Sequence, residues 1–385
     1  MLLRGFVERA LNQARVILFL VGLYSAAGRT FVSVFLKDCG LTYAQVGVLY
    51  GISAAAAVLA SPLWGAVADY TGLYAAVFRG TTLLALLPVV ALTGEFATLT
   101  LSAAALSVLV QPLIGFSDSS ILDVLDACPP PAPSSYGSVR AWLSVGMALG
   151  NVALGCALQY GGLVSWEGWA VSSGFLLLAA VVVWPYAGNW AEVGFGAAAR
   201  RLLTDWRFAL FLAVSAVNGI GNAAYDVFLI LRLNELDAGM ALIGGTAAVG
   251  SAVNVVFFFL APAFLRRMGC RWLLVLSMAT FVVRSVLYSG LSVSNARAVL
   301  AVQLLHGLNF SLMLAASVEF VKQSTARGGL LVFGRALFGV AFFGVGAVAG
   351  NWGGGLLYDA YGASVMFRWK AGLTAVAAVV FAGAE

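Results

Sequence analysis

Long apolar runs alternate with short polar connections along the whole chain. Each run is about as long as a helix needs to cross the hydrocarbon core of a bilayer, roughly 20 residues. Lipid cannot satisfy backbone amides, so runs of this length and uniformity predict helices and not barrel strands. We place twelve spans at residues 13–36, 43–68, 73–93, 97–122, 138–162, 168–187, 208–231, 240–264, 272–291, 297–321, 331–352 and 364–383.

The two halves of this pattern repeat each other. An ungapped shift of 197 residues carries Arg29 onto Asp226 and Gly72 onto Gly269, and a shift of 200 carries the segment ending at Asn151 onto the one ending at Asn351. Matching halves predict an all-helical membrane protein of two pseudo-symmetric six-helix bundles. We expect the bundles at residues 1–187 and 208–385, joined by a cytoplasmic loop at 188–207.

Small residues recur four apart in the fifth and eleventh spans. Gly146 precedes Gly150 in one half, and Gly346 precedes Gly350 and Gly354 in the other. This spacing lets helix backbones approach closely, so a packing role is favoured over a role in motion.

Composition supports a chain solvated by lipid. Hydrophobic residues make up 62% and charged residues 10%, against about 25% charged in a typical soluble domain. Fourteen basic residues fall on the side that holds the N-terminus, and five fall on the other side: Lys37, Arg232, Arg297, Arg368 and Lys370. This bias predicts cytoplasmic termini. It accounts for the net charge of +5 without nucleic acid. The plasma membrane is favoured, and an organelle membrane is the alternative.

The sequence carries no motif for catalysis or for metal binding. Cys39, Cys128, Cys156 and Cys270 show no paired or metal-ligand spacing, and there is no nucleophile elbow or phosphate-binding loop. The sequence therefore predicts neither an enzyme nor a cofactor, and the cysteines are expected to be small apolar fillers.

The loop between the second and third spans reads Gly65-Ala-Val-Ala-Asp69-Tyr-Thr-Gly72, and Leu265-Arg266-Arg-Met-Gly269 is its counterpart in the other half. This loop resembles the major facilitator superfamily. The resemblance implies gating roles for Gly65, Asp69, Gly72 and Arg266, with the aspartate capping a helix and meeting basic residues on a neighbouring span. Tyr70 and Leu73-Tyr74 stand where basic residues are usual, so the relay in the first half is expected to be weakened.

Three further segments narrow the resemblance. The stretches 136–144, 303–310 and 354–362 look like the branch that includes phenylpropionate permeases, nucleoside-proton symporters and, more distantly, lactose permease. The likeness covers nearly the whole chain and implies a carrier that works by alternating access. It does not fix the substrate, because that branch serves sugars, nucleosides and aromatic acids alike.

Four ionisable residues lie inside predicted spans: Arg29, Asp226, Arg284 and His306. Each is about 8–14 Å from the outer end of its span at 1.5 Å per residue, where a charge costs about 2.5–3.5 kcal/mol and usually faces a cavity. The resemblance implies that the first, seventh and tenth spans line that cavity. One interpretation is that Asp226 and His306 handle a proton or substrate hydrogen bonds while the arginines bind an anion. The other is a permanent ion pair that makes burial tolerable.

Neutral polar residues on the same spans could contact a solute: Tyr24, Gln111, Asn218, Asn222, Tyr225, Asn254 and Asn309. Sugar-proton symporters carry acids where this chain has Asn254 and Asn309, so any proton coupling is expected to depend on Asp226, and facilitated diffusion stays an alternative. Asp118, near the inner end of the fourth span, is expected to face Arg140 and to form part of a gate.

These observations predict a secondary transporter of a small organic solute. Two basic groups against one acid favour an organic anion. Sugars or nucleosides are the alternative within the class, and a non-transporting receptor of the same fold is the alternative outside it. The expected partners are a small-molecule substrate, a proton if transport is coupled, and the lipid bilayer. No nucleic-acid partner is expected, and we expect a monomer.

Overall fold

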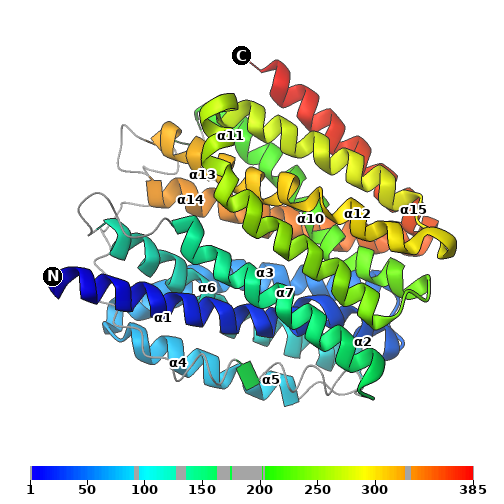
Figure 1. Ribbon diagram of the computed structural model, residues 1–385, viewed down its shortest axis with the longest axis horizontal. Coiled ribbons are helices and arrows are strands. Elements are labelled where there is room, and N and C mark those ends of the chain that lie inside the picture. Colours follow the sequence, from blue (N-terminus) through cyan, green and yellow to red (C-terminus); the bar gives the residue numbers. More distant parts are fainter. Residues whose placement is uncertain are drawn as a thin grey trace.

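The computed structural model describes residues 2–90, 95–126, 136–162, 174–175, 202, 204–325 and 331–384. In this part of the chain, long helices run roughly parallel and antiparallel in one bundle, with both termini toward the same end (Figure 1). We call that end the terminal face and the other end the opposite face. Seven helical stretches are long and apolar enough to cross a membrane, and two shorter apolar helices accompany them.

The first half of the chain supplies the lower, blue and cyan part of Figure 1. Its first span is α1 (Leu2–Ser25), the π-helical turn η1 (Ala26–Phe31) and α2 (Val32–Asp38) in direct succession. The remaining elements are α3 (Tyr43–Thr71), α4 (Tyr74–Leu84), α5 (Leu86–Val90), α6 (Phe96–Asp126) and α7 (Tyr136–Tyr160). The predicted sixth span, 168–187, lies outside the described residues except for 174–175.

The second half forms the upper, green to red part of the bundle (Figure 1). Its elements are α10 (Trp206–Glu235), α11 (Met240–Ser289), η2 (Val293–Ala298), α12 (Val299–Gln303), α13 (His306–Thr325), α14 (Leu331–Gly339), η3 (Val340–Gly346) and α15 (Ala347–Gly383). Both α11 and α15 contain a break, at Gly269 and Gly362, so each holds two successive spans. The described helices thus correspond to eleven of the twelve predicted spans, which confirms the predicted all-helical membrane fold.

The repeat seen in the sequence reappears in the backbone of the loops. Positive φ angles occur in pairs related by 197 or 200 residues: Gly40 (84°) with Asp237 (51°), Gly72 (66°) with Gly269 (74°), and Gly162 (70°) with Gly362 (79°). Left-handed backbone is costly for residues other than glycine, so matched positions indicate that the chain turns back in the same way in both halves.

The predicted close approach of helices through small residues is confirmed. A Cβ at Gly146 would lie 3.1 Å from the Cα of Gly22, and a Cβ at Gly346 would lie 2.8 Å from the Cα of Gly219. These two contacts are equivalent under the repeat, and they hold the first span of each half against its fifth span. Their role is packing, because any side chain there would meet backbone.

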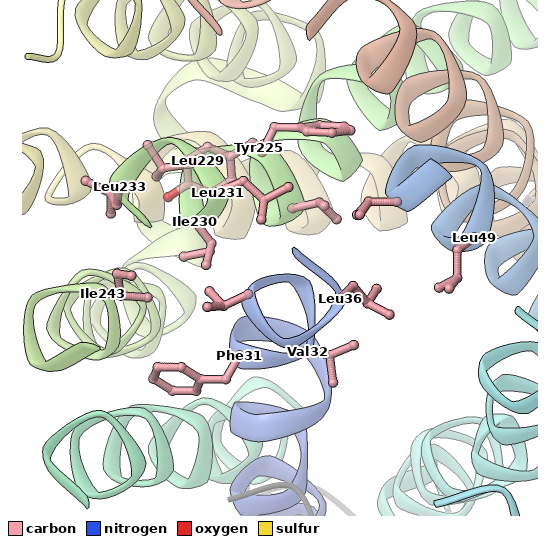
Figure 2. Packing of buried hydrophobic residues seen from close by; sticks show 14 of the residues in the cluster. Phe31, Val32, Leu36, Leu49, Tyr225, Leu229, Ile230, Leu231, Leu233 and Ile243 are labelled. Carbon is pink, nitrogen blue, oxygen red and sulfur yellow. The ribbon is translucent and has the colours of Figure 1, made fainter. Parts of the chain in front are cut away.

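Contacts between the halves follow the same symmetry. Helix α3 packs on α15, where Gly47 meets the backbone of Asn351 and Gly355, and α11 packs on α7, where Gly244 meets the backbone of Asn151 and Gly155. Near the opposite face, buried apolar residues of the first span face α10 and α11 (Figure 2): Phe31, Val32 and Leu36 with Leu229, Ile230, Leu233 and Ile243. This apolar cluster packs the two halves against each other on that side.

Three expectations from the sequence need correction. The eleventh span does not end at residue 352 but continues to Gly362, because Gly354 and Gly355 are buried in the helix and Gly355 packs on α3. Lys370 is not a basic residue of the opposite face, since it lies within the last span and is 2% exposed. The three described cysteines are not buried fillers, because Cys156 is exposed and Cys39 and Cys270 are partly exposed.

Candidate functional site

The arginine and the aspartate that the repeat superimposes form an ion pair across the two halves. Nη2 of Arg29 donates to Oδ2 of Asp226 at 2.9 Å. The amide of Asn222, one turn earlier on α10, donates to the same oxygen at 3.4 Å. The side chain of Arg29 is 56% exposed and that of Asp226 is 30% exposed, so neither is sealed inside packed helices.

Local backbone geometry places Arg29 at the same depth in the bundle as Asp226. It lies in η1, where the first span widens from an α-helix into a π-helical turn before α2 resumes. Such turns rotate the following side chains relative to a regular helix and are frequent at functional sites. Arg29 is nine residues before the end of α2, and Asp226 is nine residues before the end of α10, so both lie about 13 Å from the opposite face.

Arg284 lies in a buried network of its own. It is 1% exposed. Its guanidinium donates to Oδ1 of Asn309 at 2.9 Å, to the hydroxyl of Tyr288 at 3.1 Å and to Oε1 of Gln303 at 3.4 Å. Asn309 is held in turn by the backbone of Ser277 at 3.2 Å. Unlike Arg29, Arg284 therefore donates to neutral partners.

An aromatic stack joins this network to His306. The guanidinium of Arg284 lies 4.3 Å from the ring centre of Tyr225, and the rings of Tyr225 and His306 stack at 5.5 Å. The Tyr225 hydroxyl donates to Gln303 at 2.6 Å. His306 begins α13 directly after a break in the tenth span, and its Nδ1 is buried without a hydrogen-bond partner among the described residues. Discontinuous helices of this kind are typical of binding sites at the membrane midplane.

Other predicted solute contacts are engaged within their own half. Asn254 accepts from the hydroxyl of Ser311 at 2.9 Å, and Asn218 donates to the carbonyl of Val214 at 3.3 Å. Tyr24 is buried, and its ring lies beneath Gly28. The side chain of Gln111 lies outside the described residues.

The predicted gating residues lie at the terminal face. Gly72 caps α3 with a left-handed backbone, and its N–H donates to the carbonyl of Ala68 at 2.8 Å. Gly65 has open space around it, and Arg266 is exposed. The side chains of Asp69 and Asp118 lie outside the described residues, so the predicted pairing of Asp118 with Arg140 stays a prediction.

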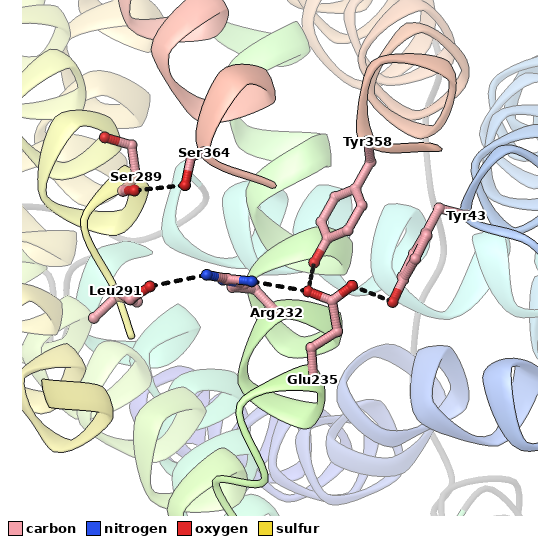
Figure 3. Close-up of polar contacts among 7 residues, drawn as sticks. All are labelled: Tyr43, Arg232, Glu235, Ser289, Leu291, Tyr358 and Ser364. Carbon is pink, nitrogen blue, oxygen red and sulfur yellow. Dashed lines mark hydrogen bonds and ion pairs between the residues drawn. The ribbon is translucent and has the colours of Figure 1, made fainter. Parts of the chain in front are cut away.

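A polar cluster at the opposite face, which we call the Glu235 cluster, was not predicted from the sequence (Figure 3). The carboxylate of Glu235 accepts from the hydroxyl of Tyr43, from that of Tyr358 at 2.7 Å and from Arg232 at 3.1 Å. Tyr43 belongs to the first half of the chain and stacks on Tyr358 at 4.2 Å. The cluster therefore ties α3 to α10 and α15.

Two helix caps extend this connection symmetrically. Asp359 accepts from the backbone N–H groups of Tyr43 and Ala44 at 3.0 and 2.8 Å, and Gln159 accepts from the N–H of Ala241 at 3.2 Å. Each cap links the end of a helix in one half to the start of a helix in the other. The positions are repeat equivalents, 159 with 359 and 44 with 241, so the repeat was the signal that could have revealed them.

The comparisons with known proteins agree with this architecture. A profile of the MFS_1 like family matches residues 14–369. The chain is 25% identical over 335 residues to the uncharacterized transporter YwbF of Bacillus subtilis (strain 168), covering 84% of this chain and 80% of the relative. It is also 25% identical over 359 residues to the probable 3-phenylpropionic acid transporter of Escherichia coli (strain K12), covering 91% of each.

Among solved structures, the nucleoside transporter NupG superimposes with a TM-score of 0.79 at 17% identity, over 97% of this chain and 98% of the other. A mutant form of NupG reaches a TM-score of 0.83 at the same identity. At this identity the likeness concerns the fold. The family profile spans most of the chain, and the sequence relatives are transporters along most of their length. The chain therefore belongs to the MFS_1 like family of the major facilitator superfamily, and it is a membrane transporter of small solutes and not an enzyme.

Proposed function

We propose that this protein moves a small organic anion together with a proton by alternating access, with the Arg29–Asp226 pair as its central site. The observation that carries the proposal is the partial exposure of an ion pair that bridges the two halves. An arginine exposed to lipid at this depth would be very costly. The open side of Arg29 is therefore inferred to face water between the halves.

The exposure of the pair also separates the two interpretations of the buried charges. A sealed ion pair costs about 3–5 kcal/mol to break by removing one partner. A solvated pair is worth only about 0–1 kcal/mol. The side chain of Arg29 is 56% exposed and that of Asp226 is 30% exposed, so this pair is closer to a solvated pair than to a sealed one. A solute can then replace one partner at little cost, which a permanent structural pair would not allow.

The balance of charge favours an anion. Only Nη2 of Arg29 has a hydrogen-bond partner among the described residues, so its remaining N–H groups can reach a carboxylate in the two-pronged geometry that guanidinium groups prefer. When the substrate carboxylate binds Arg29 in place of Asp226, the aspartate loses its ion-pair partner and can accept a proton. Anion and proton then cross as a pair whose charges cancel. A relative described as a probable 3-phenylpropionic acid transporter makes an aromatic monocarboxylate a reasonable first substrate.

Contacts between the halves at the opposite face support alternating access. The apolar cluster and the Glu235 cluster join the halves on that side, so we infer that the site opens toward the terminal face in this conformation. Rocking of the halves would break these contacts and expose the same site to the other side. Cytoplasmic termini, which the positive-inside bias supports, would make this the inward-facing state. We propose that residues 1–187 and 208–385 are the two rocking bodies and that the protein works as a monomer.

Uptake by proteoliposomes tests the proposal. The purified chain is reconstituted, an inwardly acidic or alkaline pH gradient is imposed, and uptake of labelled 3-phenylpropionate is compared with that of benzoate, a nucleoside and a disaccharide. Accumulation of a carboxylate that follows the proton gradient supports symport of an anion. Equilibration without accumulation would contradict coupling, and flux of only sugars or nucleosides would contradict the anion. No flux of any solute would favour a receptor.

Arg29→Gln sharpens the same experiment. It removes the guanidinium and leaves a shorter, neutral polar side chain. We expect transport of carboxylates to fall at least about 10-fold, since a charged hydrogen bond is worth about 1.5–3 kcal/mol, and uptake of neutral solutes to change little. An equal loss for neutral solutes would mean that Arg29 only holds the structure together.

A further inference from the structure

Helix α3 brings two hydroxyl groups to the level of the ion pair. Tyr50 and Ser53 lie three residues apart, so they share one face of the helix. Both hydroxyl oxygens are buried, and neither has a hydrogen-bond partner among the described residues. Hydroxyl groups kept from water without a partner destabilise a protein, so a pair of them on one helix face calls for an explanation.

Both hydroxyls lie at a depth similar to that of Arg29. Tyr50 follows the start of α3 by seven residues, which places it about 10 Å from the opposite face, against about 13 Å for Arg29. Tyr50 packs against the apolar cluster that contains Val32, three residues after Arg29, and Tyr225 and Val227, the neighbours of Asp226. Its ring therefore lies at the same interface between the halves as the ion pair.

The repeat shows that this arrangement is specific to the first half. The positions equivalent to Tyr50 and Ser53 are Ala247 and Gly250. A Cβ at Gly250 would lie 3.1 Å from Gln303 and 3.2 Å from the ring of His306, so in the second half this face is occupied by the histidine stack. The first half instead carries a guanidinium and two hydroxyls, and all three can donate hydrogen bonds.

We propose that Tyr50 and Ser53 complete a carboxylate-binding subsite with Arg29, in which both hydroxyls donate to the substrate's carboxylate oxygens. One full positive charge and two neutral donors match a group of single negative charge. A phosphate of charge near −2 would leave charge unbalanced in this half. The inference rests on the proposed transport of organic anions and names the residues that hold the anionic group.

Binding measurements on the purified full chain in detergent test the subsite. The probes are 3-phenylpropionate and its neutral isostere 3-phenylpropionamide, with the variants Tyr50→Phe and Ser53→Ala. We expect the Kd for the acid to rise about 10-fold or more in Tyr50→Phe, because a hydrogen bond to a charged group is lost, and to rise less in Ser53→Ala. The Kd for the amide should stay within about two-fold. Tyr361→Phe, which alters a tyrosine that is 67% exposed, is the matched control.

Melting temperatures without substrate give a second readout. Since neither hydroxyl has a partner among the described residues in this conformation, Tyr50→Phe and Ser53→Ala should leave the melting temperature unchanged or raise it. A clear loss of stability in both variants would show that the hydroxyls serve packing or an internal bond, which would overturn the subsite.

The outcomes separate the subsite from the proposed function. If Arg29→Gln abolishes binding of the acid while both hydroxyl variants bind it like the wild type, the organic anion stands and the subsite is wrong. Equal weakening for acid and amide would also overturn it, because a carboxylate contact must discriminate between the two. If the wild type binds no carboxylate from a panel of acetate, benzoate and 3-phenylpropionate, both ideas fail together.

Discussion

Replacing Gly47 and Gly244 by alanine should drive the two halves apart at the opposite face. A Cβ at Gly47 would lie well inside 3.0 Å of the carbonyl oxygen of Asn351, and one at Gly244 equally close to that of Asn151, whereas ordinary contact begins at 3.4 Å. The obstructing atoms belong to the backbone and cannot rotate away. Each substitution must therefore separate a helix pair that joins the halves, α3 from α15 or α11 from α7.

The expected magnitude follows from the cost of overpacking. Forcing one extra methyl group into a packed interface costs about 1–3 kcal/mol. The two sites belong to different helix pairs, so the double variant should pay roughly twice that amount. Since each 1.4 kcal/mol is a factor of about ten in population, a shift of roughly 30-fold or more away from this conformation is expected.

Spin labels at Tyr160 and Tyr361 report the change. These residues end spans of opposite halves at the opposite face, and they are 79% and 67% exposed. The native cysteines Cys39, Cys128, Cys156 and Cys270 are replaced first. Pulsed electron resonance should show one main distance in the parent protein. In Gly47→Ala/Gly244→Ala we expect a longer distance to dominate.

Matched alanine variants supply the control. A Cβ at Gly65 on α3 or at Gly353 on α15 would meet nothing within 4 Å among the described residues, so Gly65→Ala/Gly353→Ala should leave the distance distribution unchanged. If the Gly47→Ala/Gly244→Ala protein is folded and keeps the parent distribution, the glycine contacts do not hold the opposite face closed. The reasoning from backbone contact would then be refuted.

Three further substitutions test other parts of the structure. Glu235→Gln weakens the bonds from Tyr43, Tyr358 and Arg232, so the same spin-label pair should show more of the long distance, by about 1–3 kcal/mol; an unchanged distribution would remove the Glu235 cluster from the gate. Arg284→Lys keeps the charge but cannot form the same fork, so the melting temperature should fall, with a cost of about 2–4 kcal/mol, and an unaltered melting curve would contradict the network. Lys370→Met should raise stability by about 1–3 kcal/mol, because the Nζ of this buried lysine has no hydrogen-bond partner among the described residues, and a loss would reveal a partner.

The fold could be predicted because lipid leaves few choices. Apolar runs of spanning length must be helices, and the repeat sets their pairing, so the ion pair between Arg29 and Asp226 follows from two residues at one register in equivalent spans. Some of the helix ends could also be predicted, because Gly72 and Gly269 occupy equivalent positions in the repeat and both have positive φ angles. The end of the eleventh span was misplaced because adjacent glycines there serve contact with α3 and do not end the helix.

The rest depends on how the halves dock, which no local pattern encodes. Tyr43 and Glu235 look like ordinary residues at span ends until the bundle brings α3 beside α10. Hydropathy places Arg284 and Arg29 at similar depth, yet one is 1% exposed and the other 56%, because depth does not say which side of a helix faces packed neighbours. The burial of the Tyr50 hydroxyl and of the Lys370 ammonium group could not be predicted from the sequence for the same reason.

Accumulation and exchange by vesicles containing Asp226→Asn test the central claim most directly. Asparagine keeps the size of the side chain and one acceptor oxygen but cannot take up and release a proton. The account predicts that the variant no longer accumulates 3-phenylpropionate under an imposed pH gradient yet still exchanges it between the two sides of the membrane. Accumulation equal to that of the wild type would contradict it, because the proton would then be carried elsewhere than at the Arg29–Asp226 pair.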